Sequence, residues 1–368
     1  MPSIRRVAIS TGGGDAPGLN AVIRAVAMCA HNRSWECYGI RDGFNGIFFP
    51  ERYSDGGLMR LTRERVSGIA HLGGTILGTT NKGNPLNFPL HMADGSVKEV
   101  DRTDEILEFF AKRELDALIV VGGDGSLTIA YALSQKGLRV VGVPKTIDND
   151  LDKTVTTFGF DTAVAFATEC LDRLHSTAQS HQRVMVIEVM GRYAGWIALN
   201  AGIAGGVHAI LIPEIPFDLE KVAARIRSRD QEGRLDSLVV VAEGARPKDG
   251  ERAVMKAADT GRSERLGGIG EQVTAELQEI TGKDCRLVVL GHLLRGGSPT
   301  SFDRLTALRF GAAAIRALEE GQSGIMVALA FPNVVYVPLE EVAGRMKAVP
   351  LNSDTLLTGR DLGICFGD

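Results

Sequence analysis

The chain has 368 residues, of which 44% are hydrophobic and 23% are charged, and its formal net charge is −4. A chain of this length is too long for one ordinary hydrophobic core, so we expect two lobes. The weakly negative net charge argues against the basic surface that a nucleic-acid-binding protein requires. Because no apolar run approaches the roughly 18 residues of a membrane span and no signal-peptide core precedes the first strand, we expect a cytoplasmic protein that binds neither nucleic acid nor membranes.

Short apolar runs rich in Val and Ile recur along the chain, and helix-like segments separate them. Seven such runs predict strands: Val7–Ser10, Leu115–Val121, Val140–Val143, Arg183–Val189, Ala209–Ile212, Leu238–Ala242 and Leu287–Leu290. Their hydrophobicity is continuous rather than alternating, which is typical of strands buried on both faces of a parallel sheet. We therefore expect an α/β fold with mostly parallel, doubly wound sheets flanked by helices, and ligands at the carboxyl ends of the strands. The segment Leu86–Asp104 breaks the pattern and predicts a surface excursion such as a hairpin.

The first run leads into a glycine-rich turn, Gly12–Gly14, and helix-compatible residues follow from about Gly18. Bare N–H groups at a helix start can bind phosphate, although a tight strand-to-helix turn would use the same residues. The turn is not a Walker A loop, because no Lys-Ser or Lys-Thr pair follows Gly18. It is also a poor dinucleotide fingerprint, because Pro17 stands where a glycine is required. A dinucleotide-dependent enzyme is therefore a distant alternative.

The second run ends in the sequence GGDGS. Gly122 and Gly123 allow a ligand to approach the backbone closely after a buried strand. Asp124 would repel phosphates there unless a cation intervened, so we interpret it as a Mg²⁺ ligand beside a polyphosphate donor. The structural alternative is that Asp124 caps the following helix.

The third run ends in the sequence PKTIDND. Asp148 and Asp150 stand two apart, so they share a face if the segment is extended. Transfer of a phosphoryl group to a hydroxyl requires a carboxylate that accepts or orients the proton, which these residues could supply. An Asn- and Asp-rich turn without catalytic function is the alternative.

Arginine, glutamate and histidine residues lie near the ends of later runs. Six are candidates for binding a phosphorylated sugar: Arg183, Arg192, Glu243, Arg286, His292 and Arg295. Arginine can bind phosphate through a bidentate fork, and glutamate can accept hydrogen bonds from sugar hydroxyls. Any single one could be a surface ion pair, but the set favours phosphoryl transfer from a polyphosphate donor to a sugar phosphate.

Taken together, these motifs resemble the phosphofructokinase family. The matching stretches are GGGDAPGLNAVIR, GGTILGT, GGDGS, PKTIDND, SHQR, EVMGRYAGW, AEG, GHLLRGGSP and FDR, which occur in the family's order from Gly12 to Arg304. The ending LGICFGD is similar to that of the bacterial mixed-substrate branch, or group III. GGDGS alone would also suit NAD kinases and lipid kinases, but those families should lack PKTIDND and GHLLRGG.

The resemblance implies a phosphofructokinase-like fold of two lobes with the active site between them. Residues 1–159 and 294–344 would form the donor lobe for ATP and Mg²⁺. Residues 160–293 and 345–368 would form the sugar-phosphate lobe. The implied reaction is the glycolytic transfer of the γ-phosphoryl of ATP to the 1-hydroxyl of fructose 6-phosphate, which gives fructose 1,6-bisphosphate.

The resemblance also implies roles for individual residues. Asp148 would accept the proton of the sugar hydroxyl, and Asp124 would bind Mg²⁺ with Asp150 near it. Residues beside the transferred phosphoryl would be Lys145, Thr146 and Arg192. Those that hold the nucleotide would be Gly14, Asn81, Lys82, Gly123, Asp124, Gly125 and Ser126. Those that hold the sugar phosphate would be Thr146, Asp148, Met190, Gly191, Arg192, Glu243, His292 and Arg295, with Arg183 and Arg286 reaching in from a neighbouring subunit of a homodimer or homotetramer.

In this resemblance, two positions indicate whether ATP or pyrophosphate is the phosphoryl donor. Family members that use pyrophosphate have Asp at the position of Gly125, where it would crowd and repel the α-phosphate of ATP. Lys145, in contrast, stands where simple ATP enzymes have Gly and pyrophosphate enzymes have Lys. We weigh Gly125 more heavily and expect ATP as the donor, with a reversible pyrophosphate-dependent enzyme as the alternative. Asn81 replaces the family's donor-site Arg, and Lys82 could supply the missing charge.

The effector site of the short bacterial enzymes is only partly matched. Arg24 and Glu214 agree with it, whereas Met28 stands where a second Arg is usual and the stretch Arg234–Asp236 replaces a basic pair. We therefore expect weak or absent regulation by ADP and phosphoenolpyruvate.

Overall fold

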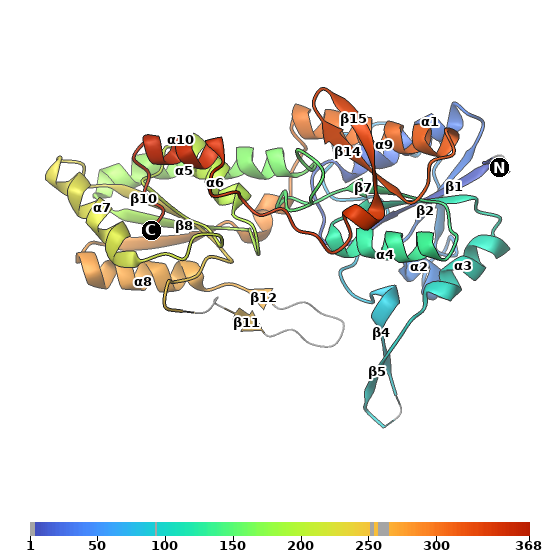
Figure 1. Cartoon of the computed structure of the whole chain (residues 1–368), viewed down its shortest axis with the longest axis horizontal. Coiled ribbons are helices and arrows are strands. Elements are labelled where there is room, and N and C mark those ends of the chain that lie inside the picture. Colours follow the sequence, from blue (N-terminus) through green and yellow to red (C-terminus); the bar gives the residue numbers. More distant parts are fainter. Residues whose placement is uncertain (1–3, 93, 251–253, 257–264) are drawn as a thin grey trace.

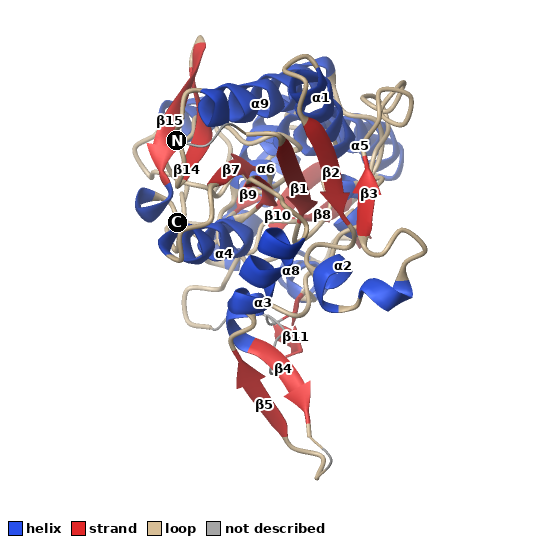
Figure 2. Ribbon diagram, turned by 90° about the vertical axis from the view of Figure 1, so that its right-hand side faces the viewer, coloured by secondary structure: helices blue, strands red, loops and turns tan. Residues whose placement is uncertain are grey.

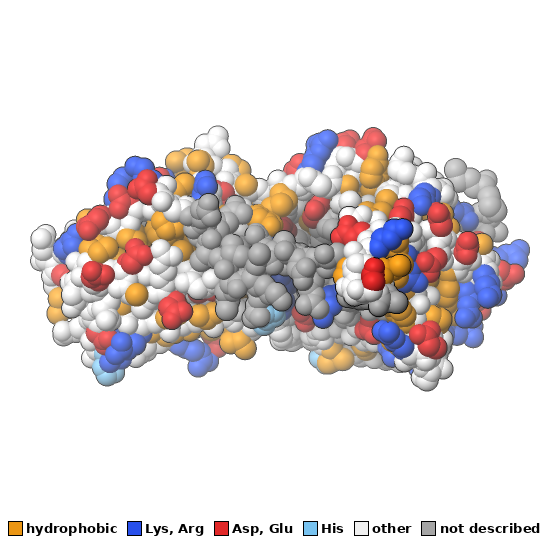
Figure 3. Space-filling view, turned by 90° about the horizontal axis from the view of Figure 1, so that it is seen from below, with side chains coloured by type: hydrophobic (Ala, Val, Ile, Leu, Met, Phe, Trp, Pro, Cys, Tyr) orange, Lys and Arg blue, Asp and Glu red, His pale blue; other side chains and the backbone are white. Residues whose placement is uncertain are grey.

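The computed structural model describes residues 4–92, 94–250, 254–256 and 265–368, which form two lobes lying side by side (Figure 1). One lobe is built on a seven-stranded sheet and the other on a four-stranded sheet. The molecular outline narrows between the lobes, and acidic and basic side chains are interspersed on the face shown in Figure 3. No helix among the described residues is both long enough and apolar enough to span a membrane.

The seven-stranded sheet has the order β15-β14-β7-β6-β1-β2-β3. Its strands are β1 (Arg6–Thr11), β2 (Glu36–Ile40), β3 (Leu58–Arg60), β6 (Ala117–Gly122), β7 (Val140–Pro144), β14 (Ile325–Ala330) and β15 (Asn333–Pro338). The five inner strands are parallel, and only the two edge strands, β3 and β15, pair in the antiparallel sense. The expected mostly parallel sheet is therefore confirmed in this lobe.

Helices cover both faces of this sheet (Figure 2). The helices α1 (Leu19–His31) and α9 (Ser301–Glu319) pack on one face, and α2 (Asn45–Phe48), α3 (Thr103–Lys112) and α4 (Asp124–Gln135) lie on the other. Alternate residues of β1 enter two different cores, since Val7 and Ile9 pack on the α1 side and Ala8 packs on the α4 side. Burial on both faces explains why this strand is hydrophobic without alternation.

The second sheet is entirely parallel and has the order β13-β8-β10-β9. Its strands are β8 (Val184–Val189), β9 (Ala209–Leu211), β10 (Ser237–Ala242) and β13 (Cys285–Val289). Its helices are α5 (Phe160–His181), α6 (Trp196–Ala204) and α10 (Asp354–Asp361) on one face, and α7 (Leu219–Gln231) and α8 (Ile269–Thr281) on the other. Both lobes are therefore doubly wound, as expected.

All seven predicted strands are present, with small shifts at their ends. The predicted excursion is confirmed as an antiparallel hairpin of β4 (Phe88–His91) and β5 (Val97–Val100), which projects away from the lobe (Figure 1). A separate two-stranded antiparallel sheet pairs β11 (Val254–Lys256) with β12 (Arg265–Leu266). Four short 3₁₀ helices complete the described elements: η1 (Pro50–Arg52), η2 (Pro85–Asn87), η3 (Gly291–Arg295) and η4 (Leu339–Glu341).

A buried carboxylate joins the first turn of α9 to the first turn of α5. Asp303 has 0% of its surface exposed, and its Oδ2 accepts hydrogen bonds from the backbone N–H of Thr162 at 2.7 Å and from the hydroxyl of Thr162 at 2.6 Å. Burial raises the pKa of Asp303 to about 6. Because α5 begins the second lobe and α9 belongs to the first, this contact fixes one connection between the two.

We expect Asp303→Ala to lower the free energy of unfolding by about 2–4 kcal/mol, because two donors of Thr162 would lose their buried acceptor. Asp303→Asn keeps an acceptor oxygen and removes the buried charge, so it should cost less than half as much. Urea unfolding at pH 8 measures both variants against the wild type. An unchanged free energy of unfolding in the alanine variant would show that the contact between Asp303 and Thr162 does not stabilise the fold.

Candidate active site

The turn after β1 lies against two other loops of the first lobe. The N–H of Gly12 donates to the carbonyl of Val121 at 3.0 Å, and the N–H of Gly13 donates to the carbonyl of Thr80 at 3.0 Å. Gly13 has a φ of +76°, a conformation that favours glycine. Thr80 is followed by Asn81 and Lys82, which are exposed. The structure thus brings the Gly12–Gly14 turn and these two residues to the same edge of the sheet.

The GGDGS stretch forms the entry into α4. Ser126 packs on the Gly12 turn so closely that a Cβ atom on Gly12 would lie 2.7 Å from its Oγ. A Cβ atom added at Gly125, in contrast, would have no heavy atom within 4 Å. The start of α4 therefore lies against the Gly12–Gly14 turn and has open space at Gly125, and a helix start with free N–H groups is an arrangement that can bind phosphate.

Asp124 is the first residue of α4 and is half-buried. Its Oδ1 accepts a hydrogen bond from the N–H of Gly344 at 2.8 Å, whereas the residue in the cap position is Gly123. Burial raises the pKa of Asp124, and the negative charge of Asp150 raises it further. The carboxylate is thus close to a second acidic group at the donor end of the sheet.

The chain bends immediately after β7. The segment is not extended as the two-residue spacing suggested, because Asn149 has a left-handed φ of 51°. The N–H of Asp148 donates to Oγ1 of Thr146 at 3.1 Å, which tightens the bend. Asp148 and Asp150 are nevertheless neighbours, since the negative charge of Asp150 raises the pKa of Asp148.

Asp148 is the most perturbed carboxyl group at this edge. Its Oδ1 is buried and has no hydrogen-bond partner among the described residues. Burial raises its pKa to about 7, the charges of Asp150 and Glu243 act in the same direction, and those of Arg295 and Lys145 oppose them. A carboxyl group that titrates near neutrality and has a bare oxygen is suited to receive a proton.

Two cations lie between Asp148 and the Gly12–Gly14 turn. Lys145 is 3% exposed and its Nζ donates to the carbonyl of Gly14. Burial, and then the charge of Arg295, lower the pKa of Lys145 to about 8. Arg295 itself donates from Nη1 to the carbonyl of Asp15 at 3.1 Å. Arg295 therefore contacts the donor-side turn, although the resemblance implied only the sugar phosphate as its partner.

The second lobe contributes the residues after β8 and β10. Met190 and Gly191 are buried, while Arg192 and Glu243 are half-buried. The two loops are bonded to each other, since the N–H of Glu243 donates to the carbonyl of Val189 at 2.9 Å. Burial raises the pKa of Glu243, and the charge of Arg192 lowers it. These residues approach the bend closely enough for Glu243 to act on Asp148.

His292 and Arg295 both lie in η3, beyond the end of β13 at Val289. A 3₁₀ turn thus separates His292 from the strand. Residues three apart are eclipsed in such a helix, so His292 and Arg295 lie on the same side of it. His292 is exposed and Arg295 is half-buried.

Arg183 and Arg286 do not lie with the other predicted residues. Both pair with Asp284, at 2.5 Å from Nε of Arg183 and at 2.6 Å from Nη1 of Arg286. They stand at the amino ends of β8 and β13, whereas the residues described above follow the carboxyl ends. A strand of this length separates the two ends by about 20 Å. Within one chain these arginines therefore belong to a different surface.

The sequence did not indicate two contacts made by the segment after η4. Gly344 binds Asp124, and Nζ of Lys347 donates to Oδ1 of Asn149 at 3.0 Å. Each contact joins residues about 200 positions apart, for which no local pattern exists. The stretch Gly344–Lys347 contains no local motif that would predict contacts with the active-site loops.

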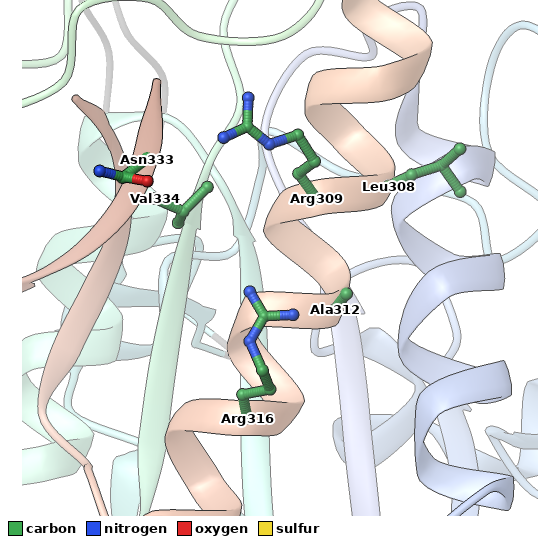
Figure 4. A pocket seen from close by; sticks show the side chains of 6 residues that line it. All are labelled: Leu308, Arg309, Ala312, Arg316, Asn333 and Val334. Atoms are coloured by element: carbon green, nitrogen blue, oxygen red, sulfur yellow. The ribbon is translucent and has the colours of Figure 1, made fainter. Parts of the chain in front are cut away.

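A groove of about 490 Å³ lies on the first lobe between α9 and β15 (Figure 4). Its lining is formed by Leu308, Arg309, Ala312, Arg316, Asn333 and Val334. None of these residues belongs to the loops described above. This groove is therefore not the candidate active site, which we identify from the chemistry of the side chains in the loops.

Comparison with known proteins gives matches along nearly the whole chain. A sequence model of the family described as Phosphofructokinase matches residues 6–318. The chain is 50% identical over 364 residues to the ATP-dependent 6-phosphofructokinase of Chloroflexus aggregans, covering 99% of this chain and 98% of that one. It is 46% identical over 370 residues to the ATP-dependent 6-phosphofructokinase 1 of a Nostoc species, covering all of both chains.

A solved structure shares the fold at lower identity. The crystal structure of a pyrophosphate-dependent phosphofructokinase from Marinobacter aquaeolei superposes with a TM-score of 0.79 over 99% of this chain and 93% of that chain. The two sequences are 22% identical, so this likeness concerns the fold alone.

Proposed function

The chain belongs to the phosphofructokinase family, and from that premise we infer that it is an ATP-dependent 6-phosphofructokinase. It transfers the γ-phosphoryl of ATP to the 1-hydroxyl of fructose 6-phosphate in glycolysis. Relatives that carry this name match the chain at 44–50% identity over nearly its full length, which supports ATP over pyrophosphate as the donor. The dinucleotide alternative is superseded by the family match.

The observation that carries the mechanism is the buried, unpartnered Oδ1 of Asp148. In our proposal this carboxylate takes the proton of the sugar 1-hydroxyl as that oxygen bonds to the γ-phosphorus and the bond to the ADP oxygen breaks. Arg192 and Arg295 stabilise charge on the transferring group, and Lys145 holds the Gly14 carbonyl beside it. The raised pKa of Asp148 suits a base that works near neutral pH.

The donor lies, in this proposal, along the open start of α4. Gly14, Gly123, Gly125 and Ser126 give it backbone N–H groups and room, and Asn81 and Lys82 border it. Asp124 would bind Mg²⁺ with Asp150 near it. No group of three or more His, Cys, Asp or Glu side chains able to hold a metal occurs among the described residues. That fits Mg²⁺, which is commonly held by one or two carboxylates together with substrate phosphates and water, and which would neutralise the phosphate oxygens when bound.

The sugar phosphate lies on the second lobe, held by Met190, Gly191, Glu243 and His292. Arg183 and Arg286 face away from this site in their own chain, which supports the proposal that they complete the site of a neighbouring copy. Asp284 keeps both guanidinium groups together. We therefore propose a homodimer or homotetramer with shared active sites.

A donor assay tests the function. With fructose 6-phosphate as acceptor, we expect ATP with Mg²⁺ to support turnover and to form ADP and fructose 1,6-bisphosphate in equal amounts. Pyrophosphate at the same concentration should give less than about a hundredth of that rate, because it lacks the α-phosphate and nucleoside of ATP, and losing about 2.7 kcal/mol of interaction with the donor site corresponds to this factor. Turnover with pyrophosphate but not ATP would reverse the donor assignment.

A further inference from the structure

The chain segment that returns from the first lobe to the second touches both acidic loops of the site. It follows η4 and comprises residues 342–349. The N–H of Gly344 donates to Asp124 at 2.8 Å, and the N–H of Lys347 donates to the carbonyl of Asp150 at 2.8 Å. The N–H of Val349 then donates to Oε1 of Glu214 at 2.8 Å in the second lobe. One short segment thus contacts the cation loop, the base loop and the sugar lobe.

Lys347 makes the most extensive of these contacts. Its ammonium donates to Oδ1 of Asn149 at 3.0 Å, to the carbonyl of Thr154 at 2.9 Å and to the carbonyl of Val155 at 3.2 Å. A lysine ammonium has three N–H donors, so all of them are used within the protein. Such a group fixes three points of the chain relative to one another.

Asn149 is the residue that determines the shape of the bend. It lies between Asp148 and Asp150 and adopts the left-handed φ of 51°. Asparagine tolerates a left-handed conformation better than most residues do, so the backbone shape suits this side chain, and the orientation of its amide is set by the bonds that the amide accepts. Oδ1 of Asn149 accepts from Lys347 and also from the N–H of Thr157 at 3.2 Å. The orientation of Asp148 therefore depends on the side chain next to it.

Lys347 also contacts the second lobe through Trp196. The indole Nε1 of Trp196 donates to the carbonyl of Lys347 at 3.0 Å, and the ammonium lies 5.6 Å from the centroid of the ring. Trp196 opens α6, directly after the loop that carries Arg192. Lys347 is thus bonded to the base loop by its side chain, and its backbone carbonyl is bonded to the first residue of α6, which follows the Arg192 loop.

We propose that Lys347 is a positioning residue for phosphoryl transfer, which holds the Asn149 bend, and with it Asp148, in a fixed orientation relative to the Arg192 loop. The inference rests on the proposed function. It adds to that function a residue that touches no substrate and acts through Asn149 and Trp196. Loss of the contact should therefore change the rate of the chemical step much more than the binding of either substrate.

The variant Lys347→Met keeps the length of the side chain and removes the three hydrogen bonds. We expect kcat to fall about 10–100-fold, because small displacements of a reacting group have effects of this size. The KM values for ATP and fructose 6-phosphate should stay within about threefold of the wild type. In Lys347→Ala, added n-propylammonium should restore part of kcat, because it replaces the missing atoms.

The matched control is Lys153→Met, which removes a lysine from the loop after β7 that Lys347 contacts. Lys153 pairs at 3.3 Å with Glu341, and both side chains are more than a third exposed. Its loss should leave kcat and both KM values unchanged. Thermal unfolding of each variant, followed by circular dichroism, identifies those that are folded at the assay temperature.

Wild-type kcat in the folded Met variant would overturn the proposal, and so would a rise of both KM values with kcat unchanged. If the Met variant does not fold, Lys347→Arg replaces it. Arginine keeps a cation beside Trp196 but presents its N–H groups in a planar fork that does not match the three acceptors. A folded Arg variant with wild-type kcat would equally overturn the proposal. A wild type without turnover on ATP and fructose 6-phosphate would instead refute the proposed function itself.

Discussion

Asp148→Ser is expected to lower kcat about 10²–10⁴-fold with ATP and fructose 6-phosphate, the usual contribution of a general base. Serine is small and polar, so it fits the space of the carboxylate without a steric clash. The fold should be kept, since Oδ1 of Asp148 makes no hydrogen bond among the described residues. The carboxylate is also costly to bury, as its raised pKa indicates. Steady-state assays of ADP formation measure the change in kcat, and urea unfolding measures the change in stability.

The control for this variant is Asp152→Ser, which makes the same change in the same loop. Oδ1 of Asp152 accepts the N–H of the adjacent Lys153 at 2.8 Å. We expect its kcat to stay within about twofold of the wild type, as for most surface changes. Near-normal turnover of Asp148→Ser would end the assignment of Asp148 as the base.

The pH profile gives a second view of the same group. Because burial and the neighbouring carboxylates raise the pKa of Asp148 to about 7, the ionised base is lost as the pH falls through that value. The kcat/KM of the wild type for fructose 6-phosphate should therefore decline on the acid side of pH 7, since this ratio reports the free enzyme. The residual activity of Asp148→Ser should lack that decline. An identical acid limb in both proteins would assign it to another group.

Most of the fold could be predicted because the central strands carry their own signal. The run in β1 is buried on both faces and reads as continuous hydrophobicity. The run in β14, Ile325–Ala330, is entirely apolar and carries the same signal, yet the expected strands did not include it. The edge strands β3 and β15 are different, because they are short or only partly buried and show no clear period.

The site could be predicted only as far as its parts are local. GGDGS and PKTIDND each follow a strand, and parallel strands place their carboxyl ends at one edge, so their proximity follows from the topology. The way in which the bend at Asn149 is held does not follow, because its amide accepts a hydrogen bond from Lys347, which lies far along the chain. The contact of Arg295 with the Asp15 carbonyl is of the same kind. Long-range hydrogen bonds have no periodicity that a sequence could display.

Gly125→Asp should change the choice of donor without unfolding the protein. A Cβ atom at this position meets no heavy atom within 4 Å, so the side chain has room in the folded chain. Its carboxylate would stand at the start of α4, one residue from Asp124, where we propose that the phosphates of ATP lie. Repulsion between like charges at such a site costs several kcal/mol, so kcat/KM for ATP should fall by about 10²-fold or more.

Pyrophosphate has no α-phosphate or nucleoside and would be affected less, and Lys145 is already in place to bind it. The ratio of pyrophosphate to ATP activity should therefore rise by about tenfold or more. Gly125→Asn, which has the same shape without the charge, separates crowding from repulsion: it should lose much less ATP activity than the Asp variant. Assays of both variants with both donors measure these ratios. An Asp variant whose kcat/KM for ATP stays within about threefold of the wild type would mean that the phosphates of ATP do not pass Gly125, and the donor site at the start of α4 would have to be abandoned.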